Sequence, residues 1–156
     1  MAGVEVDGFL ADSVAAVQGK LYALGAGWNR IHVALFPARH DRIAVGLLFR
    51  ILPGTPNESR RFELRIEGPD GEIQLGTGPD GRSVGRIGGD FTAGAAEEQI
   101  VPIALNLNSM PLGAPGDYRI VVSLNDADVK VLPFRVESLA SARPSEGTAT
   151  GTAGYL

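Results

Sequence analysis

The sequence contains no cysteine, so it forms no disulfide bond and no thiolate metal site. A chain of 156 residues is long enough to bury a core without such links. The sequence also lacks an unbroken run of about 18 apolar residues and the basic, then apolar start of a secretion signal. We therefore expect one soluble protein without a signal peptide, in the cytoplasm or in a particle assembled there.

A concentration of positive charge is missing as well. The formal net charge is −4, and Lys20 and Lys130 are the only lysines among fourteen cationic residues, which are spread along the chain. A nucleic-acid-binding protein needs a concentrated basic face. We therefore expect neither a nucleic acid nor a membrane as partner.

Motifs of known reaction chemistry are absent too. No serine lies in a glycine-flanked elbow, and "GTGPDG" lacks the lysine of a phosphate-binding loop. His32, His40 and Asp41 come nearest to a metal or proton-transfer site, but two histidines eight residues apart match no specific ligand spacing. We expect no enzyme activity, no cofactor and no metal.

Several aspartates fall in expected turns and have the oxygen ligands that calcium prefers. They are Asp70, Asp80, Asp126 and Asp128. Turn aspartates more commonly bond to their own backbone. We therefore interpret these four as turn residues.

Glycine and proline, in contrast, are abundant, with twenty-one and ten residues. They divide the sequence into short apolar segments, which is typical of an all-β domain with many turns. The clearest strand covers residues 42–51, where apolar and mixed positions alternate. Its apolar face is formed by Ile43, Val45, Leu47, Phe49 and Ile51. Such alternation predicts a central core strand.

Two further strands and a turn follow the same logic. Residues 61–67 alternate apolar side chains with charges of both signs, and "GPDG" at 68–71 has the proline and glycine of a tight turn, so we expect a hairpin reaching residue 75. Residues 101–107 alternate as well, and Pro102 should lie where no ladder hydrogen bond is needed.

The closing hairpin is "APGDYRIVVSL", the turn "NDAD" and the return strand "VKVLPFRVES". In the return strand the apolar phase changes between Val131 and Leu132. A β-bulge beside Pro133 would reconcile the two phases.

Three segments are less regular. Residues 76–96 are rich in glycine, and we expect a long mobile loop there. Residues 8–25 fit either an amphipathic helix or strands around a tight turn at "VQGK", and we favour the strands. Residues 138–156 are small and polar, so we expect a flexible tail after a domain of residues 1–137.

The order of strands ending in "APGDYRIVVSL…VLPFRV" resembles the closing strands of an immunoglobulin-like β-sandwich. The resemblance implies an antiparallel sandwich of about seven to nine strands, in which Tyr118 forms the tyrosine corner. Separately, "FLADSVAAVQGKLYALGAGWNRI" is similar to the opening of a family of small bacterial proteins of unknown function. That second resemblance implies no activity.

The only tryptophan, Trp28, follows a glycine-rich turn. We expect its ring to fill one end of the core, because tryptophan is highly buried on average. The alternative is a stacking platform for a carbohydrate or small ligand, formed by Trp28 with Tyr22.

Taken together, the patterned residues are explained by core and turns, which favours a non-catalytic interaction or structural module. A more specific form is a subunit or decoration protein of a bacterial or viral assembly. It would contact protein partners or itself through residues 138–156 and the 76–96 loop. A ligand-binding sandwich is the second hypothesis, and an enzyme of unknown type is the third.

Overall fold

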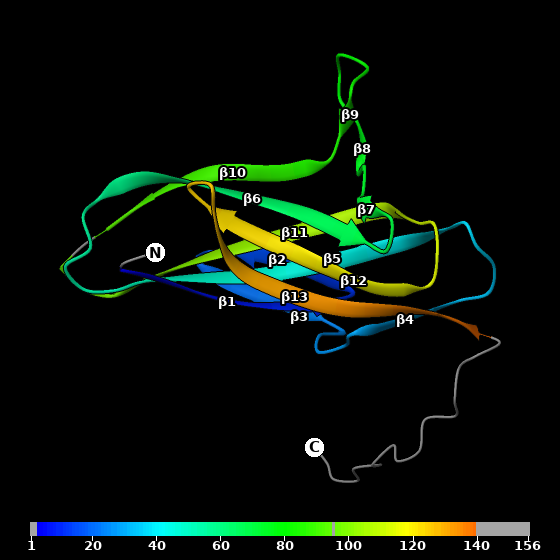
Figure 1. Ribbon diagram of the computed structural model, residues 1–156. Helices are drawn as coiled ribbons and strands as arrows, with labels where there is room; N and C mark the ends of the chain where they lie inside the picture. Colours follow the sequence, from blue (N-terminus) through cyan, green and yellow to red (C-terminus); the bar gives the residue numbers. More distant parts are fainter. Residues whose placement is uncertain (1–2, 95, 140–156) are drawn as a thin grey trace, which may run out of the picture.

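The structure is a computed structural model that describes residues 3–94 and 96–139. These residues form β-strands and no α-helix, in two packed sheets with two added hairpins (Figure 1). The sheets together have nine strands, which agrees with the expected seven to nine, and the hairpins add four more.

The first sheet is antiparallel and has three strands in the order β1-β5-β11. Their bounds are Val4–Ala11 for β1, Ala38–Ile51 for β5 and Gln99–Leu112 for β11. The long strand β5 lies in the middle, as the alternation of residues 42–51 predicts. Pro102 lies on β11, an edge strand, where one side of the backbone has no ladder to complete.

The second sheet has the order β10-β6-β12-β13-β4, with the short β7 paired to β6. Its strands are β4 (Arg30–Val33), β6 (Glu58–Gly68), β7 (Gly71–Glu72), β10 (Arg86–Ala93), β12 (Gly116–Leu124) and β13 (Ala127–Ser138). All neighbours are antiparallel except β4 and β13, which run parallel. The N-terminal segment therefore contributes β1 to one sheet and β4 to the other.

The core lies between the sheets and is formed by the inward positions of the long strands. Fully buried members include Phe49, Leu47, Leu64, Ile66, Ile120 and Leu124. At one end, the ring of Tyr118 stacks on Phe134 with 5.3 Å between centroids. The hydroxyl of Tyr118 donates a hydrogen bond of 2.6 Å to the carbonyl oxygen of Ala114, which is the geometry of a tyrosine corner.

The opposite end of β6 carries a buried charge. Arg60 is 1% exposed and follows the same alternation as the core residues Phe62 and Leu64. Its guanidinium donates to the carbonyl oxygens of Pro56, Glu58 and Ala93. Main-chain oxygens thus supply most of the partners that a buried guanidinium requires.

Residues 8–25 form strands, so the helical alternative is wrong. β2 (Ser13–Val17) and β3 (Lys20–Leu24) pair as an antiparallel hairpin. The turn between them has positive φ at both central residues, 51° at Gln18 and 74° at Gly19. Positive φ at both positions defines the type I′ turn favoured in two-residue hairpins.

Two other expectations need correction. Residues 76–96 are not one long loop, because β8 (Gly76–Thr77) and β9 (Ser83–Val84) form a protruding arm and the eight residues of β10 pair with β6. The bulge of the last hairpin lies at Val129 and not beside Pro133, since Val122 pairs with Lys130 and Ser123 with Asp128. The predicted tail begins within β13, and residues 140–156 lie outside the described residues.

Candidate interaction surface

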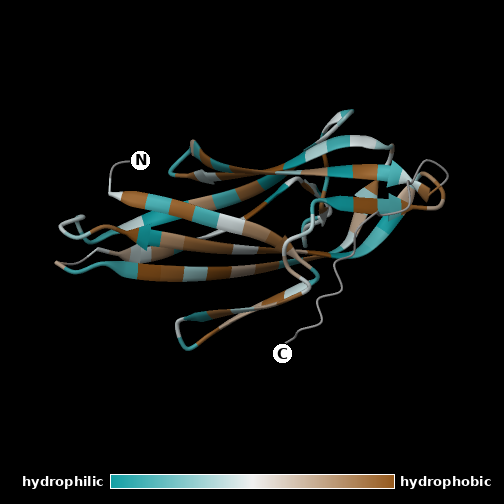
Figure 2. Cartoon of the chain, turned by 90° about the horizontal axis from the view of Figure 1, so that it is seen from below, coloured by the Kyte–Doolittle hydropathy of each residue, from teal (hydrophilic) through white to brown (hydrophobic). Residues whose placement is uncertain are grey.

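The hairpin β2–β3 packs on the outer face of the first sheet (Figure 2). A small second core holds it there, formed by Ala11, Val14 and Ala44 with Phe9 and Leu21. Gly46 leaves space on the outer face of the sheet, because it has no side chain. A Cβ atom at Gly46 would lie 2.5 Å from the ring of Phe9 and 2.9 Å from Leu21, so glycine is what lets these two side chains reach the sheet.

A side-chain amide fixes the hairpin from the edge strand. Asn106 on β11 accepts a hydrogen bond of 3.1 Å from the amide nitrogen of Val14, and its own amide donates one of 2.9 Å to the carbonyl oxygen of Val14. Asn106 therefore satisfies both backbone groups of one β2 residue, as a neighbouring strand would.

The outward face of the hairpin carries three large apolar side chains. Residues that lie opposite each other in an antiparallel pair share a face, and here the pairs Ala15 with Tyr22 and Val17 with Lys20 point away from the sheet. Leu24 lies on the same face opposite Ser13, whose hydroxyl accepts a hydrogen bond from Arg42 of β5. Val17 is 51%, Tyr22 56% and Leu24 73% exposed. We call these three side chains the hairpin face. Figure 2 shows the hairpin as a separate layer on one side of the sandwich, with apolar bands along its strands and a polar tip.

Sequence reasoning named Tyr22 but missed Val17 and Leu24 as surface residues. The turn at Gln18 and Gly19 is the sequence signal that identifies them, because it sets the register in which β2 and β3 pair. That register separates Val14 and Leu21 on one face from Val17 and Leu24 on the other, whereas the helical spacing groups them together.

Trp28 and Tyr22 lie in different surroundings. Trp28 is half-buried against the main core, and its ring meets Phe134 edge-on with 6.5 Å between centroids. Its indole nitrogen is buried and has no hydrogen-bond partner among the described residues. Tyr22 projects from the hairpin face.

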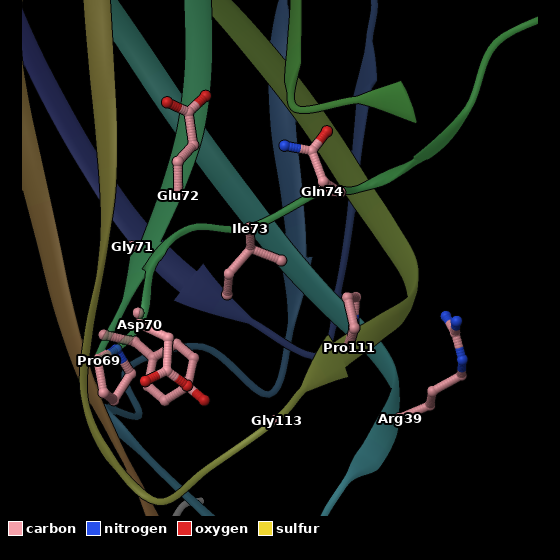
Figure 3. A pocket seen from close by; sticks show the side chains of 11 residues that line it. Arg39, Pro69, Asp70, Gly71, Glu72, Ile73, Gln74, Pro111 and Gly113 are labelled. Atoms are coloured by element: carbon pink, nitrogen blue, oxygen red, sulfur yellow. The ribbon is translucent and has the colours of Figure 1, made fainter. Parts of the chain in front are cut away.

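A pocket of about 380 Å³ opens at the sandwich end near the tyrosine corner (Figure 3). Its walls are the turn at Pro69 and Asp70, Ile73, and Pro111 across from them, and Arg39 lies at the rim. The Arg39 guanidinium donates to the carbonyl oxygen of Ser109. Tyr118 also lines the pocket, and its burial raises the pKa of its hydroxyl. A phenol with a raised pKa stays protonated at neutral pH, so it serves the corner as a hydrogen-bond donor.

The outer face of the second sheet carries a lattice of ion pairs. Arg65 donates to both carboxylate oxygens of Asp128 at 2.9 Å, which lowers the pKa of Asp128. Arg119 donates to Glu67 at 2.7 Å and is the main cause of the lowered pKa of that carboxyl. Opposite charges face each other here, so this face offers no excess of one sign to a ligand.

The histidines and turn aspartates considered as metal or proton-transfer sites lie apart from one another. His32 contacts Glu137 at 3.3 Å on the edge strand β4, and His40 lies on β5 opposite Met110. Within the described residues, no three metal-ligating side chains form a cluster. Asp128 is bound by Arg65, and Asp80 accepts a hydrogen bond from the Arg82 amide in its own turn. No helix in the described part of the chain is long and apolar enough to cross a membrane.

Comparison with family models gives one match. Residues 7–137 match the model of a family of unknown function, DUF6941. Comparison with curated proteins gives no match.

Solved structures resemble the chain at low identity. An alkylpurine DNA glycosylase from Pseudomonas fluorescens, bound to DNA with an abasic site analog, has a TM-score of 0.47 and 12% identity over 87% of this chain and 31% of that chain. A β-glucosidase from Listeria innocua has a TM-score of 0.47 and 13% identity, over 86% of this chain and 16% of that chain. An immunoglobulin-like protein from Pseudomonas aeruginosa has a TM-score of 0.43 and 16% identity, over 86% of this chain and 97% of that chain. The chain thus spans less than a third of the two enzymes, and the likeness concerns the fold alone.

Proposed function

The chain belongs to the DUF6941 family of unknown function, and we propose that it is a non-catalytic interaction module that binds a partner protein through the hairpin face. The observation that supports this is the exposure of Val17, Tyr22 and Leu24 together on one side of a short hairpin. In the more specific form of the proposal, the partner is a neighbouring subunit of a larger assembly.

Exposing these apolar side chains to water costs free energy. Each of these side chains would gain about 1 kcal/mol or more by burying the half or larger part of its surface that water now covers. Contiguous apolar surface on soluble proteins commonly marks a binding site. The attachment of the hairpin to the sheet also supports a binding role. The packing at Gly46 and the hydrogen bonds of Asn106 hold the hairpin in one position, which reduces the entropy lost on binding.

The partner we expect presents an apolar groove with an acidic rim. The groove would take the side chains of Tyr22 and Leu24, because a tyrosine with an apolar neighbour is a common anchor of protein interfaces. The acidic rim would face Lys20, which lies at the end of the hairpin face opposite Val17.

The test is photo-crosslinking in an extract of the source cells, with a benzoyl-phenylalanine at position 22. The matched control carries the same group at position 131, because Val131 is also apolar and 43% exposed but lies on β13. We expect a discrete protein adduct from position 22 that is absent at position 131. Leu24→Ser should reduce that adduct at least about tenfold. Equal adducts at both positions, or no adduct at either, would contradict the proposal.

A further inference from the structure

β10 is the outermost strand of the second sheet, and its outer edge is not protected. It pairs with β6 over eight consecutive residues without a bulge. Natural edge strands are usually blocked by proline, lysine, a bulge or short length. The segment "RIGGDFTA" has no proline, lysine or bulge, and its two charged residues, Arg86 and Asp90, are of opposite sign. In an antiparallel edge strand every second residue directs its N–H and C=O groups away from the sheet.

The other sheet edges of the described residues differ from β10. β11 carries Pro102 and Pro111, and Asn106 binds it to the hairpin β2–β3. β1 lies against β13 of the opposite sheet, so a Cβ atom at Gly8 would come within 3.4 Å of Leu132. β4 has only four residues. β10 is therefore the long edge of the described residues that is open to another strand.

The side chains of β10 are complementary to those of a second copy. Arg86, Gly88 and Asp90 alternate along the outward face of the strand. When two β10 strands pair antiparallel about a two-fold axis at Gly88, Arg86 of each copy lies directly opposite Asp90 of the other. Opposite charges at such positions stabilise a pair of strands. Within one copy Arg86 already donates to Glu72 at 3.1 Å and Asp90 lies 4.0 Å from Arg61, so each charge would be shared between its own sheet and the second copy.

The inward side chains fit the same register. Ile87 then faces Gly89 of the second copy, and Phe91 faces Gly85, so each bulky side chain meets a residue without one. Figure 1 also shows the arm β8–β9 rising past the β10 edge at the start of the strand. In a two-fold pair, each arm would flank the far end of the other copy's β10.

We propose that the protein forms a homodimer by antiparallel pairing of β10 with β10 of a second copy, in the register that joins Arg86 to Asp90. The occupant of the edge is a second copy of this chain, because a two-fold axis uses each charge pair twice. The β10 edge shares no residue with the hairpin face.

Sedimentation velocity of the purified protein tests the proposal. We expect a concentration-dependent dimer with a dissociation constant on the order of 10 µM, as suits a small interface. Arg86→Glu and Asp90→Lys should each weaken it at least about tenfold, because each places like charges opposite each other twice. Mixing the two variants should restore a heterodimer. In that heterodimer the two introduced side chains face each other with opposite charges, and the native pair of Arg86 with Asp90 forms once.

Two controls separate the β10 edge from other surfaces. Asp117→Lys makes the same change of charge on the same sheet, two strands away from β10, and should leave the dimer intact. Leu24→Ser, in the hairpin face, should leave it intact as well. A monomer at all concentrations, a dimer lost in Leu24→Ser, or single variants that do not recover on mixing would overturn the proposal.

Discussion

Replacing Asn106 with alanine is expected to loosen the hairpin β2–β3 while leaving the sandwich folded. The change removes two hydrogen bonds, of 3.1 and 2.9 Å, that join the Asn106 side chain to the amide and carbonyl of Val14. Each such bond contributes about 1 kcal/mol net. Because Asn106 is exposed and water replaces some of the loss, we expect a total of about 1–2 kcal/mol.

Most of this loss should appear as local opening and not as global unfolding. The Val14 amide loses its acceptor, so its hydrogen exchange should become about five- to thirtyfold faster, which is the same free energy expressed as a rate. Amides of β12, in the opposite sheet, should keep their protection. Hydrogen exchange followed residue by residue by NMR measures both, and urea unfolding gives the global value.

Asn108→Ala is the matched control, because Asn108 lies two residues further along β11 and its side chain accepts a hydrogen bond from Arg42. That bond is between exposed side chains, so its loss should cost under about 0.5 kcal/mol and should not change exchange at Val14. Equal effects of the two variants, or unchanged exchange in Asn106→Ala, would refute the view that this amide holds the hairpin.

Three further outcomes can be measured by urea unfolding. Gly46→Ala should destabilise the fold by about 1–3 kcal/mol, since its Cβ would lie 2.5 Å from the ring of Phe9. Arg60→Met should cost about 2–4 kcal/mol, because three carbonyl oxygens lose their donor in the protein interior. Glu67 and Asp128 have pKa values below their ordinary 4.5 and 3.8, so they stabilise the fold above about pH 4.5, and this contribution is lost as the pH falls through their folded-state values.

Each of these outcomes has its own control. Gly113→Ala should be nearly neutral, since no atom lies within 4 Å of the added Cβ. The Arg61 side chain is 61% exposed, so Arg61→Met should change the free energy of unfolding by less than about 0.5 kcal/mol. In a Glu67→Gln, Asp128→Asn double variant the acid limb of the stability curve should flatten. A loss of stability with falling pH as steep as in the wild type would show that other carboxyls cause it.

Much of the sandwich follows from two-residue alternation and turn chemistry. The apolar positions of residues 42–51 locate the central strand, and the turns at "VQGK", "GPDG" and "NDAD" locate three hairpins. The hairpin at "GPDG" is shorter than expected, because its return strand β7 ends at Glu72 and does not reach residue 75. These signals are local, because a turn residue with positive φ or a fixed proline φ needs no tertiary context.

Other features depend on contacts that the sequence does not display. Ser109 has a φ of 56°, which changes the phase of β11 so that Met110 and Leu112 are buried although Leu107 already faces inward. Arg60 is buried because carbonyl oxygens from two segments, Pro56 and Glu58 before it and Ala93 at the end of β10, meet at its guanidinium. The alternation in the sequence predicts the bulge beside Pro133 because Val129 and Val131 share one parity. The pairing with β12 instead places the bulge at Val129, which leaves Val131 43% exposed on the outer face.

The parallel pair of β4 and β13 has a mechanical consequence. Arg30 to Val33 lie beside Arg135 to Ser138 in the same direction. A force that pulls β4 toward its N-terminal end and β13 toward its C-terminal end therefore shears all of their inter-strand bonds at once. Strands joined by a tight turn would instead unzip one bond at a time. The short β4 should accordingly resist unfolding when these two strands are pulled in opposite directions.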